Sequence, residues 1–115
     1  MKHILYLFLT ALCAVFLFSS ISGARIGFGR SMEPYICTGD IVILRPAETY
    51  EVGDVIAFRR GWLGLRTVGH RIVGYHYRGG YYTKGDNCKY ADPWVVREED
   101  IIGKEVRVIR WIPRN

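Results

Sequence analysis

Hydrophobic residues follow two different patterns along the chain, and the pattern changes near residue 24. The segment from Ile4 to Ala24 contains no charged residue, and about 21 residues at a rise of roughly 1.5 Å each form a helix long enough to cross a bilayer. A basic start and the small residues SGA before Arg25 are equally typical of a cleaved signal peptide. We therefore expect 1–24 to be either a membrane anchor or a cleaved signal. Either one places 25–115 outside the cytoplasm or at its boundary.

After residue 24 the apolar residues gather in short β-branched runs separated by turn residues. IVIL (41–44) follows Gly-Asp and ends before Pro46, and VIAF (55–58) follows Gly-Asp and ends at Arg59. RIVGYHY and YYTK flank Arg-Gly-Gly, which predicts a hairpin because glycine takes positive φ readily. IIGKEVRVIRWI (101–112) predicts one more strand or a pair. The sequence therefore predicts a mainly β fold: a small, mostly antiparallel domain built on a strongly bent sheet or partial barrel.

A β domain of this size has a limited core, and aromatic residues are expected to enlarge it. The chain has three Trp and eight Tyr, and packing in the core is the default role of each. Trp111, near the end of the chain, is the best candidate for a side chain that enters a membrane interface instead.

The net charge of +5 comes from scattered basic residues rather than from a basic run on one face. Such a surface is typical of a protein beside anionic lipid headgroups. No recognition helix, zinc pattern or aromatic platform indicates nucleic acid as a partner. Cys13 lies in the apolar segment, and Cys37 and Cys88 are able to pair outside the cytoplasm, although two thiols specify no framework. The sequence has no Cys-x-x-Cys motif or Cys/His cluster, so we expect no metal and no cofactor.

Three groups in the β-rich part form a candidate hydrolytic set in chain order: Ser31, His70 and either Asp86 or Asp92. An imidazole can take the serine proton near neutral pH, and a carboxylate can hold the imidazole in the required tautomer. Each residue also has an ordinary interpretation. The serine hydroxyl can close a turn, the histidine can be a partly buried structural residue at the start of a strand, and both aspartates stand in turn signatures.

The residues beside Ser31 favour a cleft. Pro34 biases Glu33 away from helical geometry, so the chain after the serine is expected to be extended. Gly27 and Gly29 permit tight turns and the close approach of another backbone. A serine whose N–H points into such a cleft can both attack a carbonyl and help to stabilise the oxyanion.

Six blocks of the sequence resemble those of the type I signal peptidases. SMEP, TGDIVIL, VGDVIAF, GHRIVGY, YTKGDN and EEDIIGK occur in the family's order at plausible spacings from about Gly29 to Val106, after an N-terminal apolar segment. His70 before Arg71 stands where the bacterial branch carries a lysine base, so the chain resembles the Ser–His branch of archaea and the endoplasmic reticulum. The resemblance implies a mostly antiparallel β domain on the outer membrane face that cleaves presequences after small residues (Ala-x-Ala).

Residue roles follow from the same resemblance. Ser31, which opens SMEP, matches the nucleophile, and His70 matches the general base. Asp92 matches the aspartate that orients the base, and Asp86 of GDN matches a nearby aspartate that supports the site. The family's usual serine two positions before the nucleophile, which in some members donates to the oxyanion, is Gly29 here. The oxyanion is therefore expected to rely on the backbone N–H of the nucleophile.

The function implied is that of a membrane-bound serine endopeptidase that removes signal peptides from exported preproteins through an acyl-enzyme. Residues 1–24 then form a single-pass anchor and 25–115 the peptidase domain on the exocytoplasmic face, at the cell membrane if archaeal and at the endoplasmic reticulum if eukaryotic. The implied partners are preproteins emerging from the secretion translocon and membrane lipid. Two alternatives remain: a degenerate β domain that only binds, and a dedicated processing peptidase for pilin-like or conjugation substrates.

Overall fold

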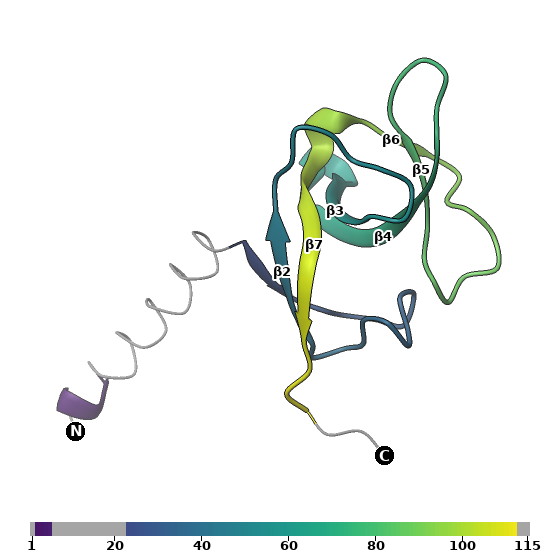
Figure 1. Ribbon diagram of the computed structural model, residues 1–115. Helices are drawn as coiled ribbons and strands as arrows, with labels where there is room; N and C mark the ends of the chain where they lie inside the picture. The colour runs from purple at the N-terminus through teal and green to yellow at the C-terminus, as the bar shows by residue number, and fades with distance from the viewer. Residues whose placement is uncertain (1, 6–22, 113–115) are drawn as a thin grey trace.

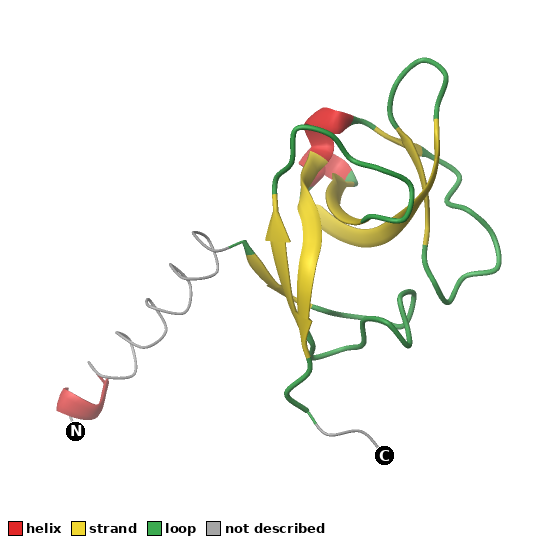
Figure 2. Ribbon diagram, in the orientation of Figure 1, coloured by secondary structure: helices red, strands yellow, loops and turns green. Residues whose placement is uncertain are grey.

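The computed structural model describes residues 2–5 and 23–112, and most of the latter segment belongs to one antiparallel sheet (Figure 1). Its seven strands lie in the order β1-β2-β7-β3-β4-β5-β6, so β1 and β6 form the edges of an open sheet within the described residues. Two single turns of 3-10 helix lie beside it (Figure 2). The mainly β, antiparallel prediction is therefore confirmed. The elements are β1 (Ala24–Ile26), β2 (Ile41–Arg45), β3 (Val55–Arg60), η1 (Trp62–Gly64), β4 (Arg66–Tyr75), β5 (Tyr81–Lys84), β6 (Val95–Val96), η2 (Glu98–Asp100) and β7 (Ile101–Ile109).

The two strands predicted after Gly-Asp are confirmed as β2 and β3. The aspartate closes the preceding turn in both cases. The N–H of Cys37 donates to Asp40 Oδ2 and the N–H of Glu51 donates to Asp54 Oδ2, each at 2.9 Å. β3 continues to Arg60, two residues past its predicted end, because the long β4 pairs with it over its whole length.

The predicted hairpin is also confirmed. β4 and β5 pair up to the Tyr75–Tyr81 register, and the turn between them uses Gly79 and Gly80 at φ of 97° and 96°. Residues 101–109 form the single strand β7 rather than a pair, and this strand lies between β2 and β3 (Figure 1). The short strands β1 and β6 were not predicted.

Alternation along the strands produces two clusters of buried side chains. Met32, Ile36, Val42, Leu44, Val55 and Ala57 form the first cluster. Tyr50, Ile56, Phe58, Ile72, Tyr81 and Val96 form the second, and Trp94 packs against it.

The default expectation of core packing is wrong for Trp62, and Trp111, which the sequence singled out as an exception, is also exposed. Trp62 is 79% exposed in η1 and Trp111 is 63% exposed. Both follow the end of a strand, and the indole N–H of Trp111 donates to the carbonyl of Gly39 at 2.6 Å. No second layer of the fold covers these positions within the described residues.

The expected N-terminal anchor falls mainly on residues 6–22, which lie outside the described residues. Among residues 2–5 and 23–112, no helix is long and apolar enough to cross a membrane. Ala24, expected as the last residue of the anchor, begins β1 and is buried. Cys37 and Cys88 are free thiols, and Cys13 is outside the described residues.

Candidate active site

Ser31 lies in the loop that connects β1 to β2. The chain turns immediately after it: the N–H of Glu33 donates to the carbonyl of Arg30 at 3.1 Å, and the N–H of Ile36 donates to that of Met32 at 3.0 Å. The prediction of an extended chain after Ser31 is therefore wrong. A turn is favoured because it buries the Met32 and Ile36 side chains, which are 5% and 8% exposed, in the first core cluster.

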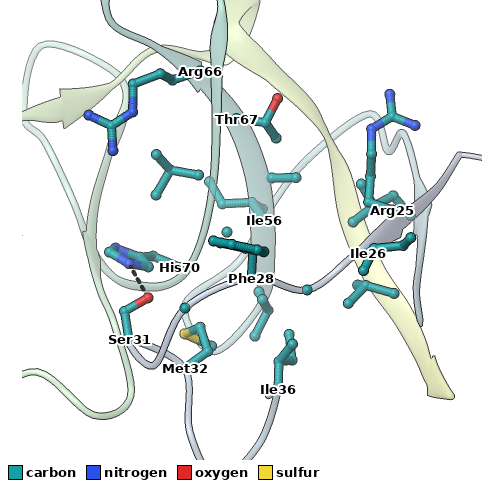
Figure 3. Close-up of a pocket in the computed structure, with 18 of the residues that line it drawn as sticks. Arg25, Ile26, Phe28, Ser31, Met32, Ile36, Ile56, Arg66, Thr67 and His70 are labelled. Atoms are coloured by element: carbon teal, nitrogen blue, oxygen red, sulfur yellow. Dashed lines mark hydrogen bonds between the residues drawn. The ribbon is translucent and has the colours of Figure 1, made fainter. Parts of the chain in front are cut away.

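His70 lies on β4, directly opposite Ile56 of β3, and is 7% exposed. Its Nε2 lies 3.1 Å from Ser31 Oγ, and its Nδ1 lies 2.6 Å from Asp92 Oδ2. An ionised carboxylate only accepts hydrogen bonds, so Nδ1 carries the proton and its N–H donates a hydrogen bond to Asp92. Nε2 is then left as the acceptor for the serine hydroxyl, as drawn in Figure 3. The structure thus brings together three of the four predicted site residues in one chain of hydrogen bonds.

Asp86 is not part of that hydrogen-bond chain. Its carboxylate accepts two hydrogen bonds from Arg71, from Nε to Oδ1 at 2.9 Å and from Nη2 to Oδ2 at 2.8 Å. Arg71 also donates to the carbonyl of Gly53 at 2.8 Å. The hydrogen bond from Arg71 lowers the pKa of Asp86 below its ordinary value. The geometry fits the supporting role expected of this aspartate rather than direct contact with His70.

The GDN turn that contains Asp86 is hydrogen-bonded to the loop that carries Ser31. The N–H of Asn87 donates to the carbonyl of Ser31 at 2.8 Å, and the Asn87 side chain donates to the carbonyl of Arg30 at 3.1 Å. A Cβ added at Gly85 would lie 2.6 Å from the Ser31 carbonyl oxygen. Only glycine lets the two backbones approach this closely. Sequence reasoning missed this contact, because no local pattern links segments more than fifty residues apart.

Thr83 is a second residue that sequence reasoning missed. Its side chain is fully buried on β5, and its hydroxyl donates to Asp92 Oδ2 at 2.7 Å. The N–H of Asp92 donates in turn to the Thr83 carbonyl at 2.8 Å. The alternation in YYTK could have indicated it, because Tyr81 and Thr83 share the inward face and a buried hydroxyl requires a partner.

Backbone N–H groups near Ser31 differ in their availability to an oxyanion. The N–H of Gly29 donates to Thr38 Oγ1 at 3.0 Å, and the same hydroxyl donates to the Gly29 carbonyl at 3.1 Å. The N–H of Ser31 donates to no acceptor in the described part of the chain. Its expected role toward an oxyanion stays a prediction.

A cleft with a volume of about 450 Å³ opens beside the Ser31–His70 pair (Figure 3). Its apolar wall contains Met32, Ile36 and Leu44, and Phe28, which is 93% exposed, also lines it. Residues 66–69 of β4 line the opposite side. They pair with β3 only, because β5 begins its pairing at Arg71, so their other edge has no strand neighbour within the described residues.

In the described segments, no three His, Cys, Asp or Glu side chains lie close enough together to hold a metal ion. Both carboxylates near His70 are already engaged, Asp92 by His70 and Thr83, and Asp86 by Arg71. The Ser31 hydroxyl and the His70 imidazole line the cleft, and the Asp92 carboxylate bonds the other nitrogen of the imidazole.

Comparison with family models, with curated proteins and with solved structures finds no match to this chain.

Proposed function

We propose that this protein is a serine endopeptidase of the type I signal peptidase kind, in the Ser–His branch, which removes signal peptides from exported preproteins after small residues. One observation carries the proposal: the continuous hydrogen-bond chain from Ser31 through His70 to Asp92 at the side of an apolar cleft. The apolar N-terminal segment supports a single-pass anchor with the cleft on the exocytoplasmic face.

The proposed reaction is acyl transfer in two steps. Ser31 Oγ attacks the scissile carbonyl while His70 Nε2 takes the hydroxyl proton, and the developing oxyanion accepts the N–H of Ser31. His70 then gives the proton to the leaving amine, which leaves an acyl-enzyme. A water molecule, deprotonated by the same nitrogen, releases the acyl group and restores the serine. Asp92 keeps the histidine in the tautomer that accepts at Nε2.

Substrate binding is proposed at the unpaired edge of residues 66–69. An extended presequence can add to this edge through main-chain hydrogen bonds and point alternate side chains toward the cleft. The wall of Met32, Ile36 and Leu44 disfavours charged side chains packed against it, because apolar side chains do not compensate for the loss of their hydration. This fits the Ala-x-Ala preference implied by the resemblance.

The test compares variants of the full chain in membranes, with a preprotein that carries an Ala-x-Ala site as substrate. Ser31→Ala and His70→Ala are each expected to lower kcat by about a thousandfold or more. His76→Ala is the matched control, because His76 lies in the β4–β5 turn, where its ring accepts the N–H of Arg78. Its activity is expected to equal that of the wild type.

Equal cleavage by wild type and Ser31→Ala would exclude the serine as nucleophile. Binding of the preprotein by both proteins, without cleavage by either, would support the degenerate binding domain instead. A comparison of signal-peptide and pilin-like substrates separates the general peptidase from a dedicated one.

A further inference from the structure

Thr83 and His70 are held on the same face of two paired strands. His70 and Ile72 are two residues apart on β4 and are both buried. Thr83 of β5 lies directly opposite Ile72 in the register, so its side chain points to the same face as that of His70. The ladder between β4 and β5 therefore fixes the positions of both side chains relative to one another.

Asp92, in contrast, lies in the connection between β5 and β6, outside any strand. Two groups of Thr83 bind it: the hydroxyl donates to Oδ2 and the carbonyl accepts the Asp92 N–H. The hydroxyl is itself restrained, because a β-branched side chain has few χ1 states in a strand. The aspartate thus receives its position from the strand next to the one that carries the histidine.

The same carboxylate oxygen, Oδ2, accepts from both Thr83 Oγ1 at 2.7 Å and His70 Nδ1 at 2.6 Å. A single hydrogen bond would leave the carboxylate free to rotate about the Cβ–Cγ bond. A second donor from a fixed direction restricts that rotation and aims the oxygen at the imidazole. We propose that Thr83 is a positioning residue of the hydrolytic site, whose hydroxyl fixes the Asp92 carboxylate so that it holds His70 with Nε2 toward Ser31. This inference rests on the proposed function.

Packing alone does not account for a threonine at this position. Its neighbours on the inward face include Ile72 and Tyr81, and valine has nearly the same shape and would bury more apolar surface. A buried hydroxyl costs free energy unless it is bonded, and the partner of this one is the Asp92 carboxylate. The threonine hydroxyl is therefore explained by its hydrogen bond to the Asp92 carboxylate, which restricts the rotation of that carboxylate.

The experiment uses the full chain in detergent micelles and two substitutions. Thr83→Val keeps the shape and removes the hydroxyl, whereas Thr83→Ser keeps the hydroxyl and removes a methyl group. If a hydrogen bond to a charged group is lost in the transition state, the rate constant is expected to decrease by about ten- to a hundredfold. We expect this decrease in kcat for Thr83→Val, with KM changed by less than about threefold. Thr83→Ser is expected to retain kcat within about threefold of the wild type.

A second readout does not depend on peptidase activity. The His70 Nδ1–H proton in a short hydrogen bond to a carboxylate gives a strongly downfield NMR resonance. It is expected to remain in Thr83→Ser and to broaden or move upfield in Thr83→Val. Thermal unfolding of each variant verifies that it is folded under the assay conditions.

Three results would overturn the positioning role: wild-type kcat in folded Thr83→Val, equal losses in both variants, or an unchanged resonance in Thr83→Val. Failure of the proposed function looks different, since wild type would then cleave no better than Ser31→Ala. In that case the resonance still decides whether the threonine orients the carboxylate.

Discussion

Replacing Gly85 with alanine tests whether the GDN turn sets the position of Ser31, the proposed nucleophile. The added Cβ would lie 2.6 Å from the Ser31 carbonyl oxygen, whereas real Cβ atoms essentially never approach another heavy atom within 3.0 Å. The Gly85 and Ser31 backbones must therefore separate by at least about 0.4 Å, the difference between these two distances. Cys88 Sγ, at 2.8 Å, can rotate away, but a backbone oxygen cannot.

A shift of this size is large compared with the tolerance of the site. The Ser31 Oγ to His70 Nε2 distance of 3.1 Å is already at the long end for a hydrogen bond. Lengthening it by about 0.4 Å removes most of the interaction, and a misplacement of about 1 Å can cost about a hundredfold in rate. We expect kcat of Gly85→Ala to fall by about ten- to a hundredfold, with a smaller change in KM because Gly85 itself does not line the cleft.

The assay is steady-state cleavage of the Ala-x-Ala preprotein, accompanied by thermal unfolding of each protein. Gly74→Ala is the matched control, because a Cβ there meets only the Tyr82 side chain at 3.6 and 3.9 Å, an ordinary contact. Its kcat is expected to match that of the wild type. A folded Gly85→Ala protein with wild-type kcat would refute the argument that the turn positions the serine.

The remaining predictions concern residues in and around the candidate site. Asp86→Asn is expected to lower stability at pH 7 by about 1 kcal/mol while retaining most activity, and Asp92→Asn is expected to lower kcat. The hydrogen bond from Arg71 lowers the pKa of Asp86 from 3.8, so its stabilisation is present above that pH and is lost as the pH falls through the native pKa. Thermal unfolding of wild type and Asp86→Asn should therefore converge in acid, and a constant difference would contradict the ion pair. Gly29→Ser introduces the residue usual at this position in the peptidases that the sequence resembles. It is expected to destabilise the protein by about 1 kcal/mol without raising kcat, because Gly29 has a φ of 92°. A higher kcat would show that the serine can reach the oxyanion.

Strands with a local signature could be predicted from the sequence. β2 and β3 each contain a β-branched run between a Gly-Asp turn and a chain breaker, and the Arg-Gly-Gly turn marks the β4–β5 hairpin. β1 and β6 have three and two residues, too few for a period-2 pattern. Their assignment depends on pairing partners elsewhere in the chain, and so does the place of β7 within the sheet.

The members of the site could be predicted, but only part of their arrangement. Chemistry restricts a serine's base to few residue types, which made Ser31 and His70 candidates, and the resemblance then gave each its expected role. Both aspartates stand in turn signatures, so the choice of Asp92 over Asp86 came from the resemblance. The structure distinguishes them, because Asp92 bonds His70 whereas Asp86 bonds Arg71. The turn after Ser31 was predicted wrongly because the preference imposed by Pro34 is local, whereas the gain from burying Met32 depends on tertiary packing.

The position of β7 has a consequence for the order in which the candidate site assembles during biosynthesis. The ladders β2–β7 and β3–β7 join the part of the sheet that carries the Ser31 loop to the part that carries His70. A nascent chain from which residues 101–109 have not yet left the ribosome already contains every reactive group but lacks the strand that joins the two parts. If the proposed function holds, such a chain is expected to be inert toward other nascent polypeptides until residues 101–109 have emerged and paired with β2 and β3.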